Sequence, residues 1–395
     1  MSRAARTRHL SVARGLLSCP TAPFLEDSPA SFVRAFARRR AGVSLAEDRY
    51  GNLAVKFPGR GRPKAPPLVL VAHLDHPGFV VDSVEDGLAH LSFRGGVRIR
   101  HARPGSRLHF FRAGGRNPVG SGRLLSASGR GARRAGFLGS GVAKVTSGRA
   151  VPGGFTMWAW PGWSVRGKRI VSRCLDDLLG AAAALAALDE LLRLRPRGAN
   201  VWALFTRAEE VGFLGTLGAI RAKTLPRGAR VISLETSRAL PSAPPGAGVI
   251  LRVGDARSVF DSRLTLVAQQ AAGELAAEGD GFRVQRRLMD GGACEATAFC
   301  AAGFRSTGLA LPLVNYHNMK GLDRGKPGIG PEAVRMEDYF SMVSLLVRLG
   351  EWSGGLAARE GETDRWLKAL SRTAHRDLLE RPLLPEGRSG KGRCR

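Results

Sequence analysis

The chain has 395 residues, of which 61 are Lys or Arg and 33 are Asp or Glu, so its formal net charge at pH 7 is +28. Hydrophobic residues make up 44% of the sequence, which is enough for a large core and excludes a chain that is disordered throughout. No apolar run reaches the ~18–20 residues that span a bilayer, so an integral membrane protein is not expected.

The N-terminal sequence, the cysteines and the distribution of charge also limit the expected compartment and partners. The N-terminal segment carries Arg3 and Arg6 without a continuous apolar stretch after them, so we expect no secretory leader. The five cysteines are an odd number without paired spacing, which is typical of reduced thiols in the cytoplasm. The basic residues are spread along the chain rather than gathered in one helix. We therefore expect a cytoplasmic protein with no nucleic-acid partner and no membrane partner.

Strands and helices alternate along most of the chain. Four uninterrupted apolar runs have the pattern of strands buried on both faces of a parallel sheet. These runs are residues 67–72, 201–206, 230–234 and 308–313. Helical patterns occur at residues 31–40, 178–194, 212–222, 260–278 and 334–349. The alternation predicts an α/β domain with a doubly wound mixed sheet and flanking helices.

One segment breaks this pattern. Residues 87–170 are rich in Gly and in short β-like runs, and they show no helical periodicity. From Glu85 to Arg169 the sequence has 16 Lys or Arg residues and only two acids, both at its start. We therefore expect a core domain from residues 1–84 and 171–350, and an inserted basic β-barrel-like domain at 85–170. Residues 351–395 would form a C-terminal helix, near 366–379, and a basic tail, at 387–395.

Metal-binding side chains follow the predicted buried strands. The four runs lead, in chain order, to His73, to Glu209 and Glu210, to Glu235, and to His317. Parallel strands present their carboxyl ends at one edge of a sheet, where ligands bind. Asp176 and Asp177 precede the helix at 178–194, and Asp75 can hold the second ring nitrogen of His73 and fix its tautomer. Imidazoles and carboxylates gathered at one edge suit Zn²⁺, or Co²⁺ and Mn²⁺ in similar sites.

Each motif by itself has a simpler explanation. The pairs Glu209-Glu210 and Asp176-Asp177 could cap helices, where carboxylates are favoured near the N-terminal amides. His73 and His317 could be ordinary core or surface histidines. The metal-site interpretation depends on their occurring together at one sheet edge. Since adjacent side chains diverge, one glutamate of the Glu209-Glu210 pair can bind a metal while the other acts as a general base.

The motifs together resemble a known family. They read Asp48-Arg-Tyr-Gly-Asn52, Ala72-His-Leu-Asp-His-Pro-Gly-Phe79, Leu175-Asp-Asp177, Glu209-Glu-Val-Gly212 and Asn315-Tyr-His317. Their order is similar to that of the glutamyl-aminopeptidase and tetrahedral-aminopeptidase family of co-catalytic di-metal peptidases, in the zinc exopeptidase clan. The spacing selects this branch, because about 100 residues, including the β insert, separate His73 from Asp176. The resemblance covers roughly residues 10–350.

The resemblance implies roles for six residues. His73 and Glu235 would bind one divalent ion, Glu210 and His317 would bind the other, Asp176 would bridge them, and Glu209 would be the general base. We place Asp75 with Glu209 as a catalytic residue. The ions would be Zn²⁺, with Co²⁺ or Mn²⁺ as alternatives, and they would activate a water for peptide hydrolysis. The family also implies peptide substrates with a free N-terminus, a homo-oligomer, and a cis peptide bond after the bridging aspartate.

The sequence departs from the family at three positions. His76 stands where the family has Glu, Leu178 where it has Arg, and Glu295 where it has Asp. These positions bear on substrate selectivity. Two alternatives to an aminopeptidase therefore stay open: a deacylase or carboxypeptidase-like amidohydrolase of the same clan, and a non-catalytic binding protein with a peptidase fold. If the basic insert borders the substrate path, acidic peptides should be drawn in; the alternative is a surface set by biased composition.

Overall fold

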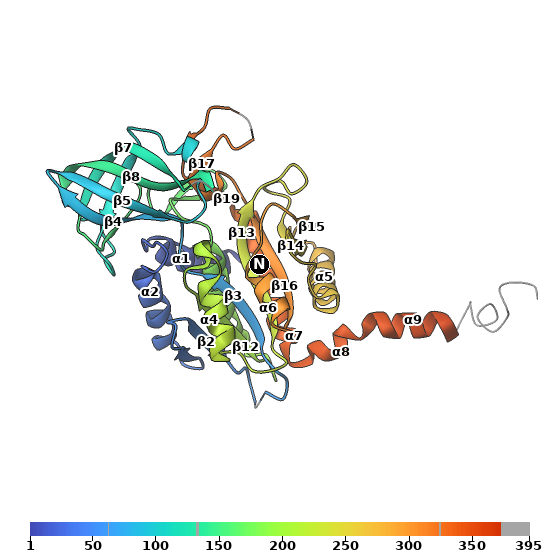
Figure 1. Cartoon of the computed structure of the whole chain (residues 1–395). Coiled ribbons are helices and arrows are strands. Elements are labelled where there is room, and N and C mark those ends of the chain that lie inside the picture. The colour runs from blue at the N-terminus through green and yellow to red at the C-terminus, as the bar shows by residue number, and fades with distance from the viewer. Residues whose placement is uncertain (62, 132–133, 324, 373–395) are drawn as a thin grey trace, which may run out of the picture. The chain divides into compact units, whose positions relative to one another are not determined.

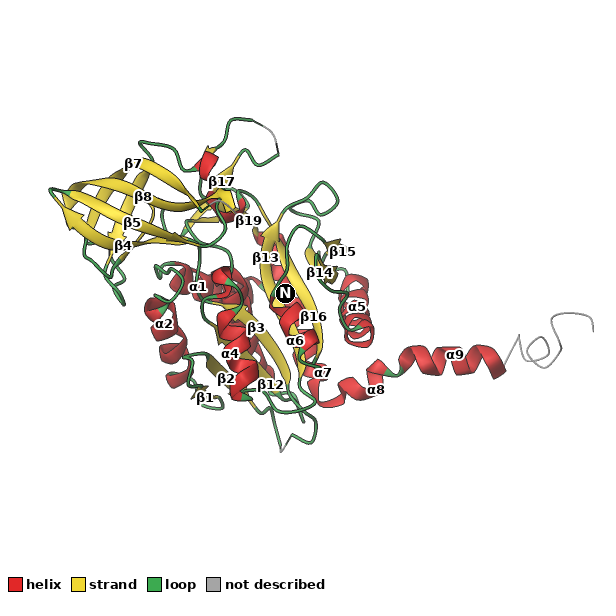
Figure 2. Cartoon of the chain, in the orientation of Figure 1, coloured by secondary structure: helices red, strands yellow, loops and turns green. Residues whose placement is uncertain are grey.

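The computed structural model describes residues 1–61, 63–131, 134–323 and 325–372. The chain divides into two units, Met1–Gly354 and Gly355–Arg395. The first unit contains a large mixed sheet with helices on it and a closed β-barrel, as Figures 1 and 2 show. This arrangement confirms the predicted fold class, an α/β domain with an inserted β domain.

The large sheet is built around the four predicted apolar runs. Its eight strands, in spatial order, are β1 (Ser44–Glu47), β2 (Leu53–Phe57), β12 (Val201–Thr206), β3 (Leu68–His73), β13 (Arg230–Arg238), β16 (Arg305–Leu313), β14 (Val249–Asp255) and β15 (Val284–Met289). The central strands β12, β3, β13 and β16 are parallel to one another. Antiparallel pairing of β2 with β12 and of β14 with β16 makes the sheet mixed. The carboxyl ends of the four central strands therefore share one edge.

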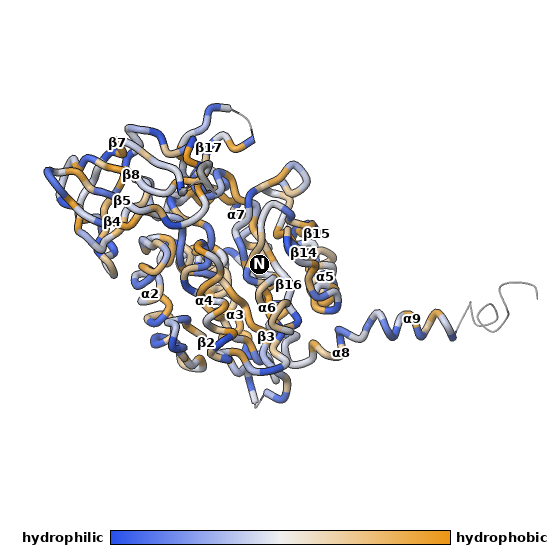
Figure 3. Tube along the Cα trace, viewed as in Figure 1, coloured by the Kyte–Doolittle hydropathy of each residue, from blue (hydrophilic) through white to orange (hydrophobic). Residues whose placement is uncertain are grey.

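Helices cover both faces of this sheet. The helices of the first unit are α1 (Arg3–Leu17), α2 (Asp27–Arg38), α3 (Leu178–Leu194), α4 (Leu214–Ala222), α5 (Ser262–Ala277), α6 (Glu295–Ala301) and α7 (Met336–Trp352). Val69 and Val71 of β3 share a core cluster with Ala219 of α4 and Phe299 of α6. Because side chains alternate along a strand, the other residues of β3 point to the opposite face, where α3 packs. β3 and α3 are apolar along most of their length (Figure 3).

Helix α1 was not among the predicted elements. Its basic residues mask a buried face that contains Ala5, Val12, Ala13 and Leu16, and the Ser2 side chain caps its first turn by accepting a hydrogen bond from the Ala5 N–H. The helix becomes stable through packing against α3, which lies far away in the sequence.

The barrel strands lie between Gly78 and Trp158, so the barrel begins before the expected insert at 85–170. Its six strands, in order around the barrel, are β4 (Gly78–Glu85), β5 (Leu88–Arg94), β8 (Arg134–Gly148), β7 (Gly120–Arg130), β6 (Arg107–Phe111) and β9 (Phe155–Trp158). Apolar side chains such as Phe79, Phe93 and Phe110 fill its interior. Because the barrel closes, its strands have no free edge that a helix would have to cover. This agrees with the lack of helical periodicity in this part of the sequence.

Two small sheets connect the barrel to the large sheet. They consist of β10 (Ser164–Arg166), β11 (Arg169–Ser172) and β19 (Glu332–Arg335), and of β17 (Met319–Lys320) and β18 (Gly328–Ile329). β11 leads the chain back from the barrel towards Asp176, and β19 pairs with it from the far end of the sequence. Segments about 160 residues apart therefore meet beside the sheet edge.

The second unit contains α8 (Leu356–Glu360) and α9 (Glu362–Arg372). Trp366 and Leu367 of α9 are 59% and 52% exposed. The rest of the predicted helix at 366–379 and the basic tail at 387–395 lie outside the described residues. Within the described residues, no helix has the length and apolar character needed to cross a bilayer.

Candidate metal centre

The sheet edge brings the sequence-predicted donors together. His73 is the last residue of β3, and Glu235 lies near the end of the neighbouring strand β13. Glu209 and Glu210 form a 3₁₀ turn after β12, and His317 lies in a similar turn after β16. Asp176 arrives from another direction, in the connection between β11 and α3, and its peptide bond to Asp177 is cis, as the family resemblance implied.

These donors form three overlapping groups. His73, Asp176 and Glu235 each offer an atom within 4.8 Å of the others, and so do Asp176, Glu210 and His317. His73 also groups with Glu209 and Glu210. The Nε2 atom of His317 lies 2.9 Å from Glu210 Oε1 and 3.3 Å from Asp176 Oδ2. The Nε2 atom of His73 lies 3.6 Å from the other oxygen of Asp176, Oδ1. Asp176 thus presents one oxygen to each histidine.

Both imidazoles have one nitrogen occupied by the protein. The Nδ1 atom of His317 is 3.0 Å from the carbonyl oxygen of Gly96, and the Nδ1 atom of His73 is 3.1 Å from the carbonyl oxygen of Asp75. Since a carbonyl only accepts, we assign the proton of each neutral ring to Nδ1, which leaves the Nε2 lone pair facing the carboxylates. Lone pairs and anionic oxygens at these separations require a proton or a metal ion between them.

Burial strengthens this requirement. His73, Asp176, Glu235 and His317 are each 7% exposed or less. Asp176 Oδ1 and Glu210 Oε1 are buried and accept no hydrogen bond. Buried anionic oxygens without partners are strongly destabilising unless a proton or a metal ion compensates them. The residues therefore fit a site for divalent cations, by their chemistry and by their orphaned oxygens.

Burial and neighbouring charges shift the pKa values of several site residues. Burial raises the pKa of Glu235 to about 8, although the charges of His73 and Arg252 act in the other direction. Burial also raises the pKa of Glu209 well above its usual range. Burial would lower the pKa of His317, but the charge of Glu210 and the hydrogen bond with Asp176 raise it to about 10. Without metal, the protein must therefore hold protons where a cation would otherwise lie.

Asp75 lies beside the turn at Glu209–Val211. Its Oδ1 atom accepts the backbone N–H of Glu209 at 2.9 Å, and its Oδ2 atom accepts that of Glu210 at 3.1 Å. Oδ1 is also 3.4 Å from Nδ1 of His73. One buried carboxylate thus ties the first histidine to the turn that carries both glutamates. Asp75 therefore contacts His73 and the backbone of the Glu209-Glu210 turn, and its catalytic role stays a prediction.

Two further side chains form hydrogen bonds with the backbone at Asp176. Glu332 Oε2 accepts the N–H groups of Leu175 at 2.5 Å and of Asp176 at 3.2 Å. His76 Nδ1 is 2.6 Å from the Asp176 carbonyl oxygen, and its Nε2 is 3.1 Å from Oδ1 of Asn318, the residue after His317. His76, which departs from the family pattern, therefore links the two loops that supply Asp176 and His317.

The other two departures are also buried next to the site. Leu178 is fully buried at the start of α3. Glu295 is fully buried, and its Oε1 accepts hydrogen bonds from Thr206, at 2.5 Å, and from Thr216. None of these changes removes a metal donor.

Sequence reasoning missed Glu332, Asn318 and Arg252. Arg252 is 3% exposed and its charge lowers the pKa of Glu235. A signal for it was present, since Arg252 is the one charged residue in the otherwise apolar strand sequence from Val249 to Val253. Glu332 and Asn318 gave no such signal, because their roles depend on contacts with residues more than 100 positions away.

The donors open into a cavity of about 560 Å³. Apolar side chains including Phe213, Met289 and Leu322 form part of its wall, and Gly96, Arg98 and Phe137 of the inserted segment form another part. Such a cavity, with a few polar groups and apolar walls, is suited to a small ligand or to the end of a peptide.

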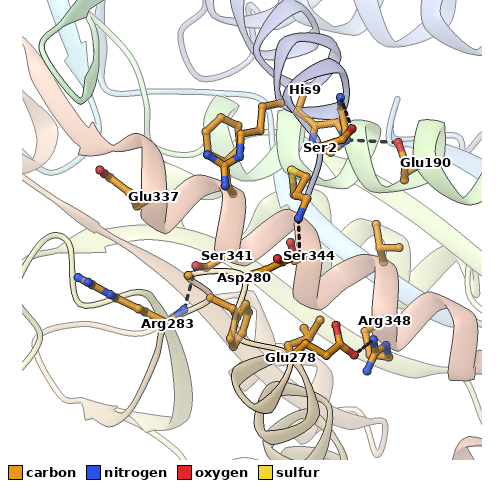
Figure 4. A pocket seen from close by; sticks show the side chains of 18 of the residues that line it. Ser2, His9, Glu190, Glu278, Asp280, Arg283, Glu337, Ser341, Ser344 and Arg348 are labelled. Atoms are coloured by element: carbon orange, nitrogen blue, oxygen red, sulfur yellow. Dashed lines mark hydrogen bonds and ion pairs between the residues drawn. The ribbon is translucent and has the colours of Figure 1, made fainter.

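A separate cavity of about 620 Å³ lies between α1, α5 and α7 (Figure 4). Two ion pairs lie at its wall: the Met1 amine with Asp280 at 2.8 Å, and Arg348 with Glu278 at 2.6 Å. None of the metal-site donors lines it.

Part of the chain is similar to a known protein family. Residues 151–323 match the family described as M42 glutamyl aminopeptidase. No curated protein matches the chain.

Several solved structures share the fold. An aminopeptidase from the archaeon Desulfurococcus kamchatkensis is 17% identical, with a TM-score of 0.71 over 88% of this chain and 95% of its own. A TET aminopeptidase from a marine-sediment Thaumarchaeota archaeon is 17% identical, with a TM-score of 0.71 over 89% and 97%. The Pyrococcus horikoshii TET1 peptidase, described as assembling into a tetrahedron or a large octahedral shell, is 19% identical, with a TM-score of 0.67 over 87% and 99%.

Proposed function

We propose that this chain, which belongs to the M42 glutamyl aminopeptidase family of metallo-exopeptidases, removes N-terminal residues from peptides with the help of two divalent metal ions. The observation that carries the proposal is the pair of buried donor groups that share Asp176. One shared carboxylate between two groups is the arrangement expected of a co-catalytic site with two ions.

In this proposal the donors divide as the sequence resemblance implied. His73 and Glu235 would hold one ion, Glu210 and His317 the other, and Asp176 both. When bound, the two ions would polarise the scissile carbonyl and lower the pKa of a water molecule. We propose Zn²⁺ for both positions, with Co²⁺ or Mn²⁺ as the alternatives, because imidazole and carboxylate donors suit all three.

Glu209 is the proposed general base. Its Oε2 lies 3.9 Å from Nε2 of His73, its side chain lines the cavity, and Asp75 fixes its backbone. Burial raises its pKa, so its carboxylate is a stronger base than an exposed glutamate. Glu209 would take a proton from the attacking water as the C–O bond forms. It would return that proton to the departing amine nitrogen as the C–N bond breaks.

The proposal extends to assembly and location. Relatives with this fold are described as a dodecamer and as tetrahedral or octahedral shells, which supports a homo-oligomer here. A cytoplasmic location is supported by the thiols of Cys19, Cys174, Cys294 and Cys300, which are free.

A substrate panel tests the reaction. Metal-free protein is loaded in turn with Zn²⁺, Co²⁺ or Mn²⁺ and given peptides with free N-termini, N-acylated amino acids, and peptides blocked at the C-terminus. We expect cleavage of every peptide with a free N-terminus and no cleavage of the N-acylated compounds. Preferential cleavage of N-acyl amino acids would establish a deacylase instead. Metal binding without hydrolysis of any compound would favour a binding protein on a peptidase fold.

A further inference from the structure

Three arginines line the catalytic cavity, and they differ in their partners. Arg252 is buried beside Glu235 and donates to Ser237 Oγ at 3.3 Å. Arg238 pairs with the carboxylate of Asp323. Arg98 lines the same cavity and, among the described residues, has no carboxylate within ion-pair distance. Arg98 is exposed, so its guanidinium is open to a ligand in the cavity, whereas Arg252 is buried.

Arg98 is also held in place. Its guanidinium carbon lies 4.1 Å from the centre of the Phe137 ring, and residue 98 forms a β-bridge with residue 137. Its backbone N–H points at Met319 Sδ, 3.3 Å away, in the strand that follows His317. A guanidinium stacked on an aromatic ring keeps its N–H groups free at the edge, where they can bind a carboxylate.

The position of Arg98 relative to the metal donors is fixed by the same segment. Gly96, two residues earlier, accepts the Nδ1 hydrogen bond of His317 with its carbonyl. Two residues of chain span at most ~7 Å. The root of the barrel therefore places a cation at the cavity wall while it orients a metal donor. Between Gly87 and Arg169 the sequence contains no acid that could neutralise this cation.

We propose that Arg98 binds a carboxylate of the peptide substrate on the leaving-group side of the scissile bond, and so makes the protein selective for short or acidic peptides. The inference rests on the proposed function. The ligand chemistry is a carboxylate, which has two sources in a peptide: the C-terminus of a dipeptide, or an acidic side chain in the residue after the scissile bond. Arg98 is a specificity-determining residue in this proposal.

Two matched substrate pairs separate these sources. The first pair is Leu-Gly and Leu-Gly amide, which differ only in the terminal carboxylate. The second pair is Leu-Asp amide and Leu-Asn amide, which differ only in the side-chain charge. All four have the same N-terminal leucine, so any preference for the first residue cancels. The measured quantity is the ratio of kcat/KM within each pair, in which metal loading and the fraction of folded enzyme also cancel.

For the wild-type enzyme we expect a ratio of about tenfold in favour of the carboxylate in at least one pair, since a charge-assisted hydrogen bond has this magnitude. Preference in the first pair identifies the C-terminus as the source, and preference in the second identifies the side chain. The Arg98→Met variant should bring the ratio to about one, and Arg98→Lys should keep part of it, because lysine retains the charge without the planar fork. The ratio should also fall between 0.05 and 0.5 M salt.

The control is Arg123→Met, which removes an exposed barrel arginine that donates to Gly105 O and does not line the cavity. It should leave activity and both ratios unchanged. A wild-type ratio near one in both pairs, with all four peptides cleaved, overturns the inference and leaves the proposed function intact. An unchanged ratio in Arg98→Met also overturns it. Failure to cleave any of the four peptides would overturn the proposed function itself.

Discussion

The carboxyl edge of the large sheet and the inserted barrel differ in the sign and the burial of their charged side chains. At the sheet edge, acids and imidazoles are buried, and one oxygen of Asp176 faces each histidine. In the barrel, the sequence from Gly87 to Arg169 contains no acid, and the exposed Arg123 donates to the backbone carbonyl of Gly105. The difference shows that the charges at the sheet edge depend on one another, whereas each charge in the barrel acts almost independently of the others.

This contrast follows from dielectric screening. Buried charges interact strongly with every neighbour, so the removal of one changes the protonation and metal affinity of the rest. Exposed charges are screened beyond about 8–10 Å at physiological salt, so each acts nearly alone. Substitutions at the edge should therefore have large effects that depend on one another, and substitutions in the barrel should have small effects that add.

The largest expected effect is that of Asp176→Asn. An amide in place of the shared carboxylate cannot balance two cations, so the variant should lose bound metal at both positions and at least about 1,000-fold in kcat/KM. Elemental analysis of the purified protein measures the metal, and circular dichroism checks that the fold is retained. The control Asp82→Asn changes an exposed barrel acid that accepts from Ser92. Two ions per chain in Asp176→Asn would contradict the shared-ligand assignment.

The next largest effect is that of Glu209→Gln. The amide keeps the shape of the side chain but cannot accept the proton of the attacking water, so kcat should fall by about 100-fold to 10,000-fold while both ions stay bound. Parallel assays of turnover and metal content measure the two quantities on the same sample. A metal-replete variant with nearly wild-type kcat would exclude Glu209 as the base.

A smaller effect concerns the pH dependence of the metal-free protein. A group whose pKa rises on folding stabilises the fold at low pH, and this contribution is lost as the pH rises through the folded-state pKa. The window runs from 4.5 to about 8 for Glu235 and from 6.5 to about 10 for His317. The melting temperature of metal-free protein should therefore fall by several degrees between pH 6 and pH 9.

Metal should reverse that trend, because the donors bind it deprotonated and binding releases protons. The stabilisation by added Zn²⁺ should accordingly grow over the same pH range. Thermal melts with and without Zn²⁺ measure both slopes, and Glu235→Gln should flatten the metal-free slope. A melting temperature that rises with pH in the metal-free protein would show that these groups do not retain protons in the folded state.

The smallest effect is expected in the barrel. Arg107→Ala and Arg123→Ala each remove an exposed cation from paired strands, and each should change the free energy of unfolding by no more than about 0.5 kcal/mol. Arg107 and Arg123 lie directly opposite each other on β6 and β7, so the double variant should depart from the sum of the two single effects by a few tenths of a kcal/mol at most, about the size of an exposed pair interaction. Chemical denaturation measures all three. A large coupling energy between the two substitutions would show that charges in the barrel also depend strongly on one another, and would contradict the difference from the sheet edge.

The sequence by itself determined the central strands and the donors that follow them. Uninterrupted apolar runs indicate buried parallel strands, and polar residues at their ends are a local pattern that needs no knowledge of the fold. His73, Glu209, Glu210, Glu235 and His317 could all be chosen in this way. The spacing of about 100 residues between His73 and Asp176 likewise located the insert, because the intervening segment lacks helical periodicity.

Only the tertiary structure decided how the donors face each other and what holds them. Asp176 comes from a connection held by Glu332 and His76, and His317 is oriented by a barrel carbonyl at Gly96. Helix α1 is stable because α3 covers its buried face. These contacts join residues about 100 or more positions apart, and a contact of that range leaves no periodicity in either segment. Such a contact depends on two segments that the fold brings together, so neither segment's own sequence predicts it.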